Sequence, residues 1–229
     1  MLKIDWRALA CTAALGATAL LPAQAALVTF DDVALPLLLG DGQTFTSGGF
    51  SFRQSGDFGT VDTVAGSFFG NVPANPTGRY YSGFNDSGVT MTTGNTRALL
   101  LGGFKAAFLP EVPGFYDLGE EVGRLVAQYT TFAGVSGVET FSLGGAVAGG
   151  LFNYVTYSGA ALGALSQPLS SVTFFACAFD LRGNCTNPST NVAQFALDNI
   201  RAEVPVPGTL ALAALGFVAL GAVRRRSAR

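Results

Sequence analysis

The sequence predicts an all-β fold, a β-sandwich of jelly-roll type, between two apolar terminal segments. Short runs rich in Val, Phe, Tyr and Thr alternate with clusters of Gly, Asn, Asp and Ser, as in strands joined by turns. Several runs have period two; in the last, Phe195 and Leu197 share one face and the residues between and beside them share the other. The region between the terminal segments, residues 26–203, is long enough for one domain with a sizeable core.

Strands, turns and one helix are predicted within this region. The strands are expected at residues 27–30, 49–54, 89–93, 97–104, 124–132, 139–143, 151–157, 171–179 and 192–203. Turns are expected at residues 41–42, 47–49 and 85–88. A short helix is expected at 116–122, with Asp117 as its cap and Glu120 as the answering residue. The Gly- and Ala-rich stretch 144–150 is either a loop or a tightly packed strand corner.

The N-terminal segment has the pattern of a secretory signal peptide. Lys3 and Arg7 form a short positive region, residues 8–21 are apolar, and Pro-Ala-Gln-Ala at 22–25 offers a small-x-small cleavage site. We therefore expect residues 1–25 to be removed during export.

The C-terminal segment, residues 204–229, has the pattern of a stop-transfer signal. Its residues are the hinge Val204, Pro205, Val206 and Pro207, the apolar stretch 208–223, and the cluster Arg224, Arg225 and Arg226. Burying an apolar helix in the bilayer is favourable, whereas moving several guanidinium groups across it is not. The stretch is shorter than the ~20 residues that a helix needs to cross a bilayer. We expect a transmembrane helix that holds the chain temporarily, with permanent tethering as the alternative.

This order of Pro motif, Gly/Ala/Leu helix and Arg cluster resembles the PEP-CTERM sorting domain of Gram-negative bacteria, which exosortase recognises. The usual motif is Val-Pro-Glu-Pro, and Val206 replaces the Glu. Upstream, Gln194, Phe195 and Asp198 match the Gln-Phe-x-x-Asp signature of a subgroup of these proteins. The resemblance implies export, a transient stay in the inner membrane, processing by exosortase near residues 205–207, and a final place at the cell surface or in extracellular polysaccharide.

The cysteines agree with export. Cys177 and Cys185 flank a predicted turn at 180–184, and in an oxidising compartment we expect them to form a disulfide. A two-cysteine metal site is the alternative, but it lacks further ligands because the chain contains no His. Cys11 lies within the expected signal peptide, where it leaves a lipoprotein as a second interpretation.

Charge and composition exclude several functions. Residues 26–203 hold seven Arg and Lys against fourteen Asp and Glu, so nucleic acid is not an expected partner. The absence of His excludes Ser-His-Asp and Cys-His nucleophiles, and we predict no catalytic residues. Carboxylate-only chemistry on glycans stays open as the alternative. The adjacent pair Glu120 and Glu121 is more simply explained as a solvated turn.

Three aspartates form a candidate calcium site. Asp31 and Asp32 follow the first predicted strand, and Asp198 lies in the last. The first and last strands of jelly rolls commonly lie side by side, and calcium prefers carboxylate and carbonyl oxygens. The arrangement resembles the structural calcium site of carbohydrate-binding jelly rolls. The alternative, which we favour, is that these residues cap turns or accept backbone hydrogen bonds.

The function that these observations favour is that of a non-catalytic surface or matrix protein, with exopolysaccharide as a candidate partner. The sole tryptophan, Trp6, lies in the expected signal peptide, so a sugar platform would have to use tyrosines. The candidates are Tyr80, Tyr81, Tyr116, Tyr154 and Tyr157. A carboxylate-dependent extracellular enzyme and a permanently tethered surface protein are the alternatives.

Overall fold

The computed structural model describes residues 25–63, 72–76, 78–94, 97–110, 116–180, 182–185 and 193–204. Apart from Ala25 and Val204, the predicted signal peptide (1–25) and sorting signal (204–229) lie outside these residues. Within the described ranges, no helix has the length and apolar character needed to cross a membrane.

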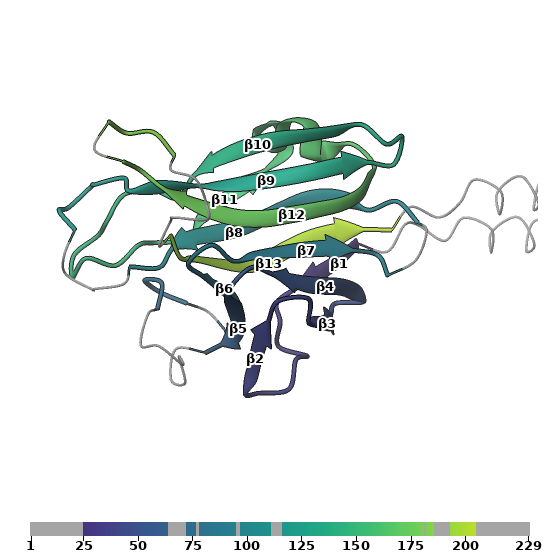
Figure 1. Cartoon of the computed structure of the whole chain (residues 1–229), viewed down its shortest axis with the longest axis horizontal. Helices are drawn as coiled ribbons and strands as arrows, with labels where there is room; N and C mark the ends of the chain where they lie inside the picture. The colour runs from purple at the N-terminus through teal and green to yellow at the C-terminus, as the bar shows by residue number, and fades with distance from the viewer. Residues whose placement is uncertain are drawn as a thin grey trace, which may run out of the picture. The chain divides into compact units, whose positions relative to one another are not determined.

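The larger of two antiparallel sheets contains seven strands (Figure 1). In spatial order they are β11 (Val155–Ser158), β8 (Leu100–Phe108), β13 (Phe195–Glu203), β6 (Tyr80–Phe84), β5 (Phe58–Asp62) and β2 (Leu37–Gly40), with β1 (Ala25–Val28) also paired to β13. The first and last strands of the domain are therefore neighbours, as predicted.

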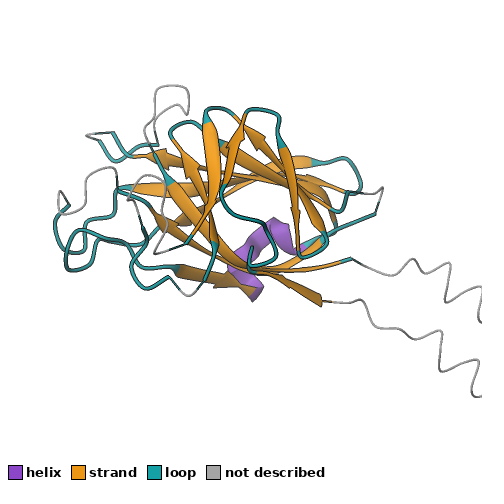
Figure 2. Ribbon diagram, turned by 90° about the horizontal axis from the view of Figure 1, so that it is seen from below, coloured by secondary structure: helices purple, strands orange, loops and turns teal. Residues whose placement is uncertain are grey.

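The second sheet contains six strands and lies against the first. Its order is β10 (Ser136–Ser142), β9 (Gly123–Thr131), β12 (Leu169–Ala178), β7 (Gly88–Thr92), β4 (Phe50–Ser55) and β3 (Thr44–Ser47). A 3-10 helix, η1 (Gly159–Ser166), connects β11 to β12 and is drawn in purple in Figure 2. The predicted β-sandwich is confirmed in this two-sheet form.

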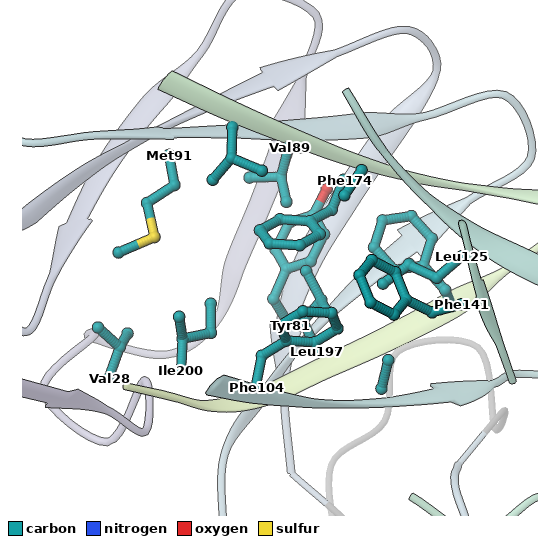
Figure 3. Packing of buried hydrophobic residues seen from close by; sticks show 14 of the residues in the cluster. Val28, Tyr81, Val89, Met91, Phe104, Leu125, Phe141, Phe174, Leu197 and Ile200 are labelled. Atoms are coloured by element: carbon teal, nitrogen blue, oxygen red, sulfur yellow. The ribbon is translucent and has the colours of Figure 1, made fainter. Parts of the chain in front are cut away.

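The core between the sheets is rich in aromatic side chains (Figure 3). The ring of Phe104 on β8 lies 5.1 Å from the rings of both Phe141 on β10 and Phe174 on β12. These contacts join the two sheets through edge-to-face packing, which adds to the apolar area they bury. Nearby, the buried hydroxyl of Tyr81 donates a hydrogen bond to Gln54 on the opposite sheet. The Phe-rich composition is thus used mainly in the core.

Strand β13 changes partner in its middle. Residues 195–197 pair with β6, whereas residues 200–203 pair with β1 on the same side. Between them the register with β8 shifts after Asp198, and Asn199 adopts a left-handed backbone with φ of 51°. Asn is among the few residues that tolerate this conformation. The irregularity is a β-bulge that lets one strand serve two successive partners.

Several local predictions were incomplete. Strands β2, β3, β5 and β6 were not predicted, although the three predicted turns lie at the ends of β2, β3 and β6. The helix expected at 116–122 is wrong: residues 118–119 form a turn, in which Gly119 has φ of 83°. The capping contact itself does form, because the amide of Asp117 donates to Glu120 Oε2 at 2.9 Å.

The predicted disulfide joins Cys177 on β12 to Cys185, with their Cα atoms 5.3 Å apart. Within the loop, Asp180 Oδ1 accepts hydrogen bonds from the amides of Arg182 and Asn184, at 2.8 and 2.9 Å. These amides hold the pKa of Asp180 below its ordinary value. The loop is thus closed twice, by a covalent bond and by a carboxylate that caps its backbone.

We predict that the double substitution Cys177→Ala and Cys185→Ala lowers the free energy of unfolding by about 2 to 3 kcal/mol, because it frees a short loop in the unfolded chain. Urea denaturation of residues 26–203, in oxidising and reducing buffer, measures this. Reducing agent should destabilise the unsubstituted domain by a similar amount and leave the double variant unchanged. An equal response of both proteins to the reductant would contradict the prediction.

Candidate functional site

Asp31 joins the end of β1 to the start of β6. The amide of Arg79 donates to Asp31 Oδ1 at 3.2 Å, and Arg79 Nη1 donates to the Asp31 carbonyl oxygen at 2.9 Å. The same guanidinium also donates to the carbonyl oxygen of Val33. Since β1 and β6 follow one another along β13, these contacts hold the junction between the two strands.

Asp32 contacts the other sheet. Its Oδ1 accepts a hydrogen bond from the Ser47 hydroxyl at 2.5 Å, and its Oδ2 accepts one from the Gly48 amide at 2.9 Å. Burial opposes ionisation of this carboxyl, but these two bonds and the charge of Arg79 outweigh it, so the pKa of Asp32 is lowered. Adjacent aspartates in one turn therefore fasten the two sheets separately, as the turn-capping alternative predicts.

Asp198 is buried at the bulge of β13, with 3% of its surface exposed. Its carboxylate accepts hydrogen bonds from the amide and the side-chain nitrogen of Asn199, at 2.6 and 2.9 Å. Burial raises the pKa of Asp198 to about 6. The Asn199 amide and the charge of Lys105 oppose this rise, and the charge of Asp31 adds to it. Asp198 is therefore disposed to hold a proton near neutral pH.

A row of polar residues crosses the outer face of the seven-stranded sheet at the level of Asp198. Register pairs join Asp62 to Tyr80, and Asp198 to Lys105. Lys105 in turn pairs with Thr156. Leu197 pairs with Tyr81, so the next residue of β13, Asp198, lies opposite Tyr80. The row therefore runs Asp62, Tyr80, Asp198, Lys105, Thr156. The row thus brings two carboxylates and one ammonium group to one level of the sheet.

A neighbouring row contains buried hydroxyls. Thr60, Ser82, Ala196 and Ala107 are successive register partners, and Tyr154 packs against the buried cluster that includes both alanines. Within the part of the chain that the structure describes, the Ser82 and Tyr154 hydroxyls have no hydrogen-bond partner. Burial, followed by the negative charge of Asp198, raises the pKa of Tyr154 well above its ordinary value. Buried hydroxyls without a partner are uncommon in folded proteins, so these two are unusual features of the face.

The tyrosines considered for sugar binding are mostly covered. Tyr80, Tyr81 and Tyr157 are buried, while Tyr116 and Tyr154 are half-buried. Tyr116 packs against Phe108 and Phe152 at ring distances of 5.9 and 5.5 Å. A sugar needs an accessible ring face, so the structure gives no stacking platform at the buried three.

The two aspartates in the polar row are also covered. Asp62 and Asp198 are separated by one strand on the outer face, but only 4% and 3% of their surfaces are exposed. A general acid must reach the glycosidic oxygen directly or through one water, which these positions prevent. Glu120 and Glu121 are exposed, in the turn before β9, as their interpretation as a solvated pair requires.

The three aspartates make separate protein contacts. Both oxygens of Asp32 accept protein hydrogen bonds at the β3–β4 turn, whereas Asp31 and Asp198 lie near β6. Over the described ranges, no cluster of acidic residues or cysteines is arranged to hold a metal ion. Calcium binding by Asp31, Asp32 and Asp198 stays a prediction, and the observed contacts favour the turn-capping alternative.

We predict that Asp32→Ala lowers the free energy of unfolding by about 1 to 3 kcal/mol, because the Ser47 hydroxyl and Gly48 amide lose a charged acceptor. Thermal and urea unfolding measure the change, and Asp117→Ala, at an exposed turn, is the control. Added calcium should leave the melting temperature of the unsubstituted domain unchanged. A calcium-dependent rise that Asp32→Ala abolishes would restore the metal site.

Asp198 should make the domain less stable as the pH rises. Its carboxyl has a pKa of about 6 when folded against 3.8 as the ordinary value, so the folded state binds the proton more tightly. The resulting stabilisation is complete below pH 4 and is lost as the pH rises through 6, a change of about 3 kcal/mol. Asp198→Asn, which stays neutral, should remove this part of the pH profile, and Asp117→Asn should not. Parallel profiles for all three proteins would contradict the assignment.

Comparison with known proteins supplies a fold relative and a tail motif. A DUF4465 family protein from Bacteroides caccae has a TM-score of 0.52 at 13% identity, over 80% of this chain and 100% of that one. The CBM22-2 xylan-binding domain of Paenibacillus barcinonensis Xyn10C has a TM-score of 0.33 at 12% identity, over 78% and 98%. The CBM22-1–CBM22-2 tandem domain of the same protein has a TM-score of 0.34 at 8% identity, over 80% and 45%. The first likeness shows the β-sandwich fold alone, and the other two are too weak to support a conclusion.

No curated protein is detectably similar to this chain. Residues 203–226, however, match the family described as the PEP-CTERM protein-sorting motif. The matched segment contains the Pro hinge and the Arg cluster, whereas the upstream Gln-Phe-x-x-Asp signature stays a prediction. The match supports a PEP-CTERM protein, and the motif implies an exported chain that transits the membrane with exosortase as its processing partner.

Proposed function

We propose that residues 26–203 form a non-catalytic surface or matrix domain, which export and exosortase processing deliver to the outside of the cell. The match of residues 203–226 to the sorting motif carries this proposal. The motif begins at Glu203, which is also the last residue of β13. Sorting signal and folded domain therefore meet without an intervening linker.

The boundaries of the sandwich are compatible with removal of both terminal signals. Cleavage after Ala25 would remove one of the four β1–β13 register pairs and leave those of Ala26, Leu27 and Val28. Processing near residues 205–207 would leave β13 complete. The mature chain would thus keep the strand pairing on which its fold depends.

The non-catalytic part of the proposal is supported by burial. The paired carboxylates on the outer face are covered, and the chain has no His for other acid–base systems. Association with exopolysaccharide is proposed from the expected location alone, because the buried tyrosines provide no ring face on which a sugar could stack. A glycan array and a hydrolysis assay on residues 26–203 separate a binder from an enzyme.

The processing itself has a direct test. In a host with exosortase, intact-mass measurement of the protein should find a C-terminus near residues 205–207, and deletion of the enzyme should leave the full tail. Pro205→Ala with Pro207→Ala should give mostly unprocessed chain in the membrane fraction, because the hinge of the motif is lost. Pro168→Ala, in the exposed loop before β12, is the matched control and should be processed normally.

Two results would contradict the proposal in different ways. A full-length tail in the membrane fraction of both strains would favour the permanently tethered alternative. Recovery of the domain from the cytosol with its leader intact would exclude export.

A further inference from the structure

The turn between β9 and β10 presents apolar side chains to solvent on a fixed backbone. Phe132 and Val135 are 56% and 63% exposed, and Val138 on β10 is 57% exposed. The turn is closed by hydrogen bonds between Thr131 and Val135 in both directions, and Gly134 supplies the left-handed φ of 85° that its backbone requires. Three exposed apolar side chains around one ordered turn form a small candidate contact surface.

This turn lies at the end of the sandwich from which the sorting motif continues. Glu203 pairs with Leu100 on β8, and the adjacent Leu99 exchanges two hydrogen bonds with Leu169 at the start of β12. Leu169 in turn pairs with Thr131, the last residue of β9. Three strand spacings thus separate Glu203 from the turn, roughly 15 Å. Figure 1 shows the β9–β10 turn and the end of β13 at the same, right-hand end.

The distance from this end to the membrane segment is short. Residues 204–207 separate Glu203 from the apolar stretch that begins at Gly208. Four residues span at most about 14 Å when fully extended. While the tail is in the bilayer, the end of the sandwich that carries Phe132 is therefore held at the membrane surface.

The charges of the sandwich are distributed to favour this orientation. At the opposite end, where β4 and β12 finish and β7 and β9 begin, acidic residues outnumber basic ones. The acidic residues there are Asp41, Asp57, Asp86, Asp117, Glu120, Glu121 and Asp180, and the basic ones are Arg53, Arg124 and Arg182. At the near end Arg79, Arg97 and Arg201 balance Asp31, Asp32 and Glu203, and residues 130–138 carry no charge. An anionic bilayer repels the far end more than the near one.

We propose that Phe132 and Val135 insert into the lipid interface while the sorting tail holds the chain, so that the sandwich docks on the membrane at two points. This inference rests on the proposed membrane transit. The tether keeps the turn at a high local concentration beside the bilayer, which makes a small apolar contact sufficient. Cutting the tail removes that advantage, and the acidic domain leaves the membrane.

The test places a fluorescent reporter at each end of the sandwich in residues 26–229, the chain without its expected leader. These residues contain no natural tryptophan, so Phe132→Trp or Val135→Trp reports from the turn alone. Leu118→Trp is the matched control, because Leu118 is 80% exposed at the far end. Each chain is reconstituted in vesicles of phosphatidylethanolamine and phosphatidylglycerol with brominated acyl chains. We expect blue-shifted, strongly quenched emission from Trp at 132 or 135 and unquenched emission from Trp at 118.

The possible outcomes distinguish this inference from the proposed function. Chains that float with the vesicles but show the same unquenched emission at all three positions overturn the docking contact and leave the membrane transit intact. Chains that do not float overturn both. Residues 26–207 with Phe132→Trp should float at least tenfold less than residues 26–229 with the same substitution, since the tether is missing. Equal flotation would show that the turn does not depend on the tether.

Discussion

Strand β13 is the backbone element on which the rest of the sandwich depends, because three other strands pair with it. It contacts β8 along most of its length, and β6 and β1 in succession on its other side. One strand can serve two successive partners only if its course changes between them, and the bulge at Asp198 and Asn199 makes that change. The bulge buries a carboxylate, whose desolvation is offset in part by the Asn199 amide and the charge of Lys105.

The same junction explains the two roles of the adjacent aspartates. Asp31 contacts Arg79 at the start of β6, while Asp32 turns toward Ser47 and Gly48 in the other sheet. Consecutive side chains in a turn point in different directions, so one Asp-Asp pair can fasten both layers. This is a structural use of acidic residues, and it accounts for both oxygens of Asp32 without a metal ion.

The sequence was sufficient for the parts of the chain whose signals are local. Gly-containing turns, the pairing of Cys177 with Cys185, and the sorting motif depend on nearby residues, and all three were predicted. Strands β5 and β6 were not, because nearly all their residues are buried on both faces and the period-two pattern disappears. The helix predicted at 116–122 does not form. The predicted contact between Asp117 and Glu120 is present, but it closes a single turn in which Gly119 has a left-handed backbone.

The candidate site was harder to predict because proximity on a sheet comes from register. Sequence reasoning placed Asp198 beside the first strand but could not place Asp62, Tyr80 and Lys105 in one row with it, since these residues lie far apart in the chain. The burial of Asp62 and Asp198 limits what the row can do. The covered carboxyl of Asp198 makes the stability of the domain depend on pH, but it does not meet a polymer outside. The exposed chemistry lies instead at the ends of the sandwich, apolar and nearly neutral where the sorting motif continues and acidic at the far end. This difference between the two ends suits a domain that the membrane holds by its apolar end before processing and releases once the tail is cut.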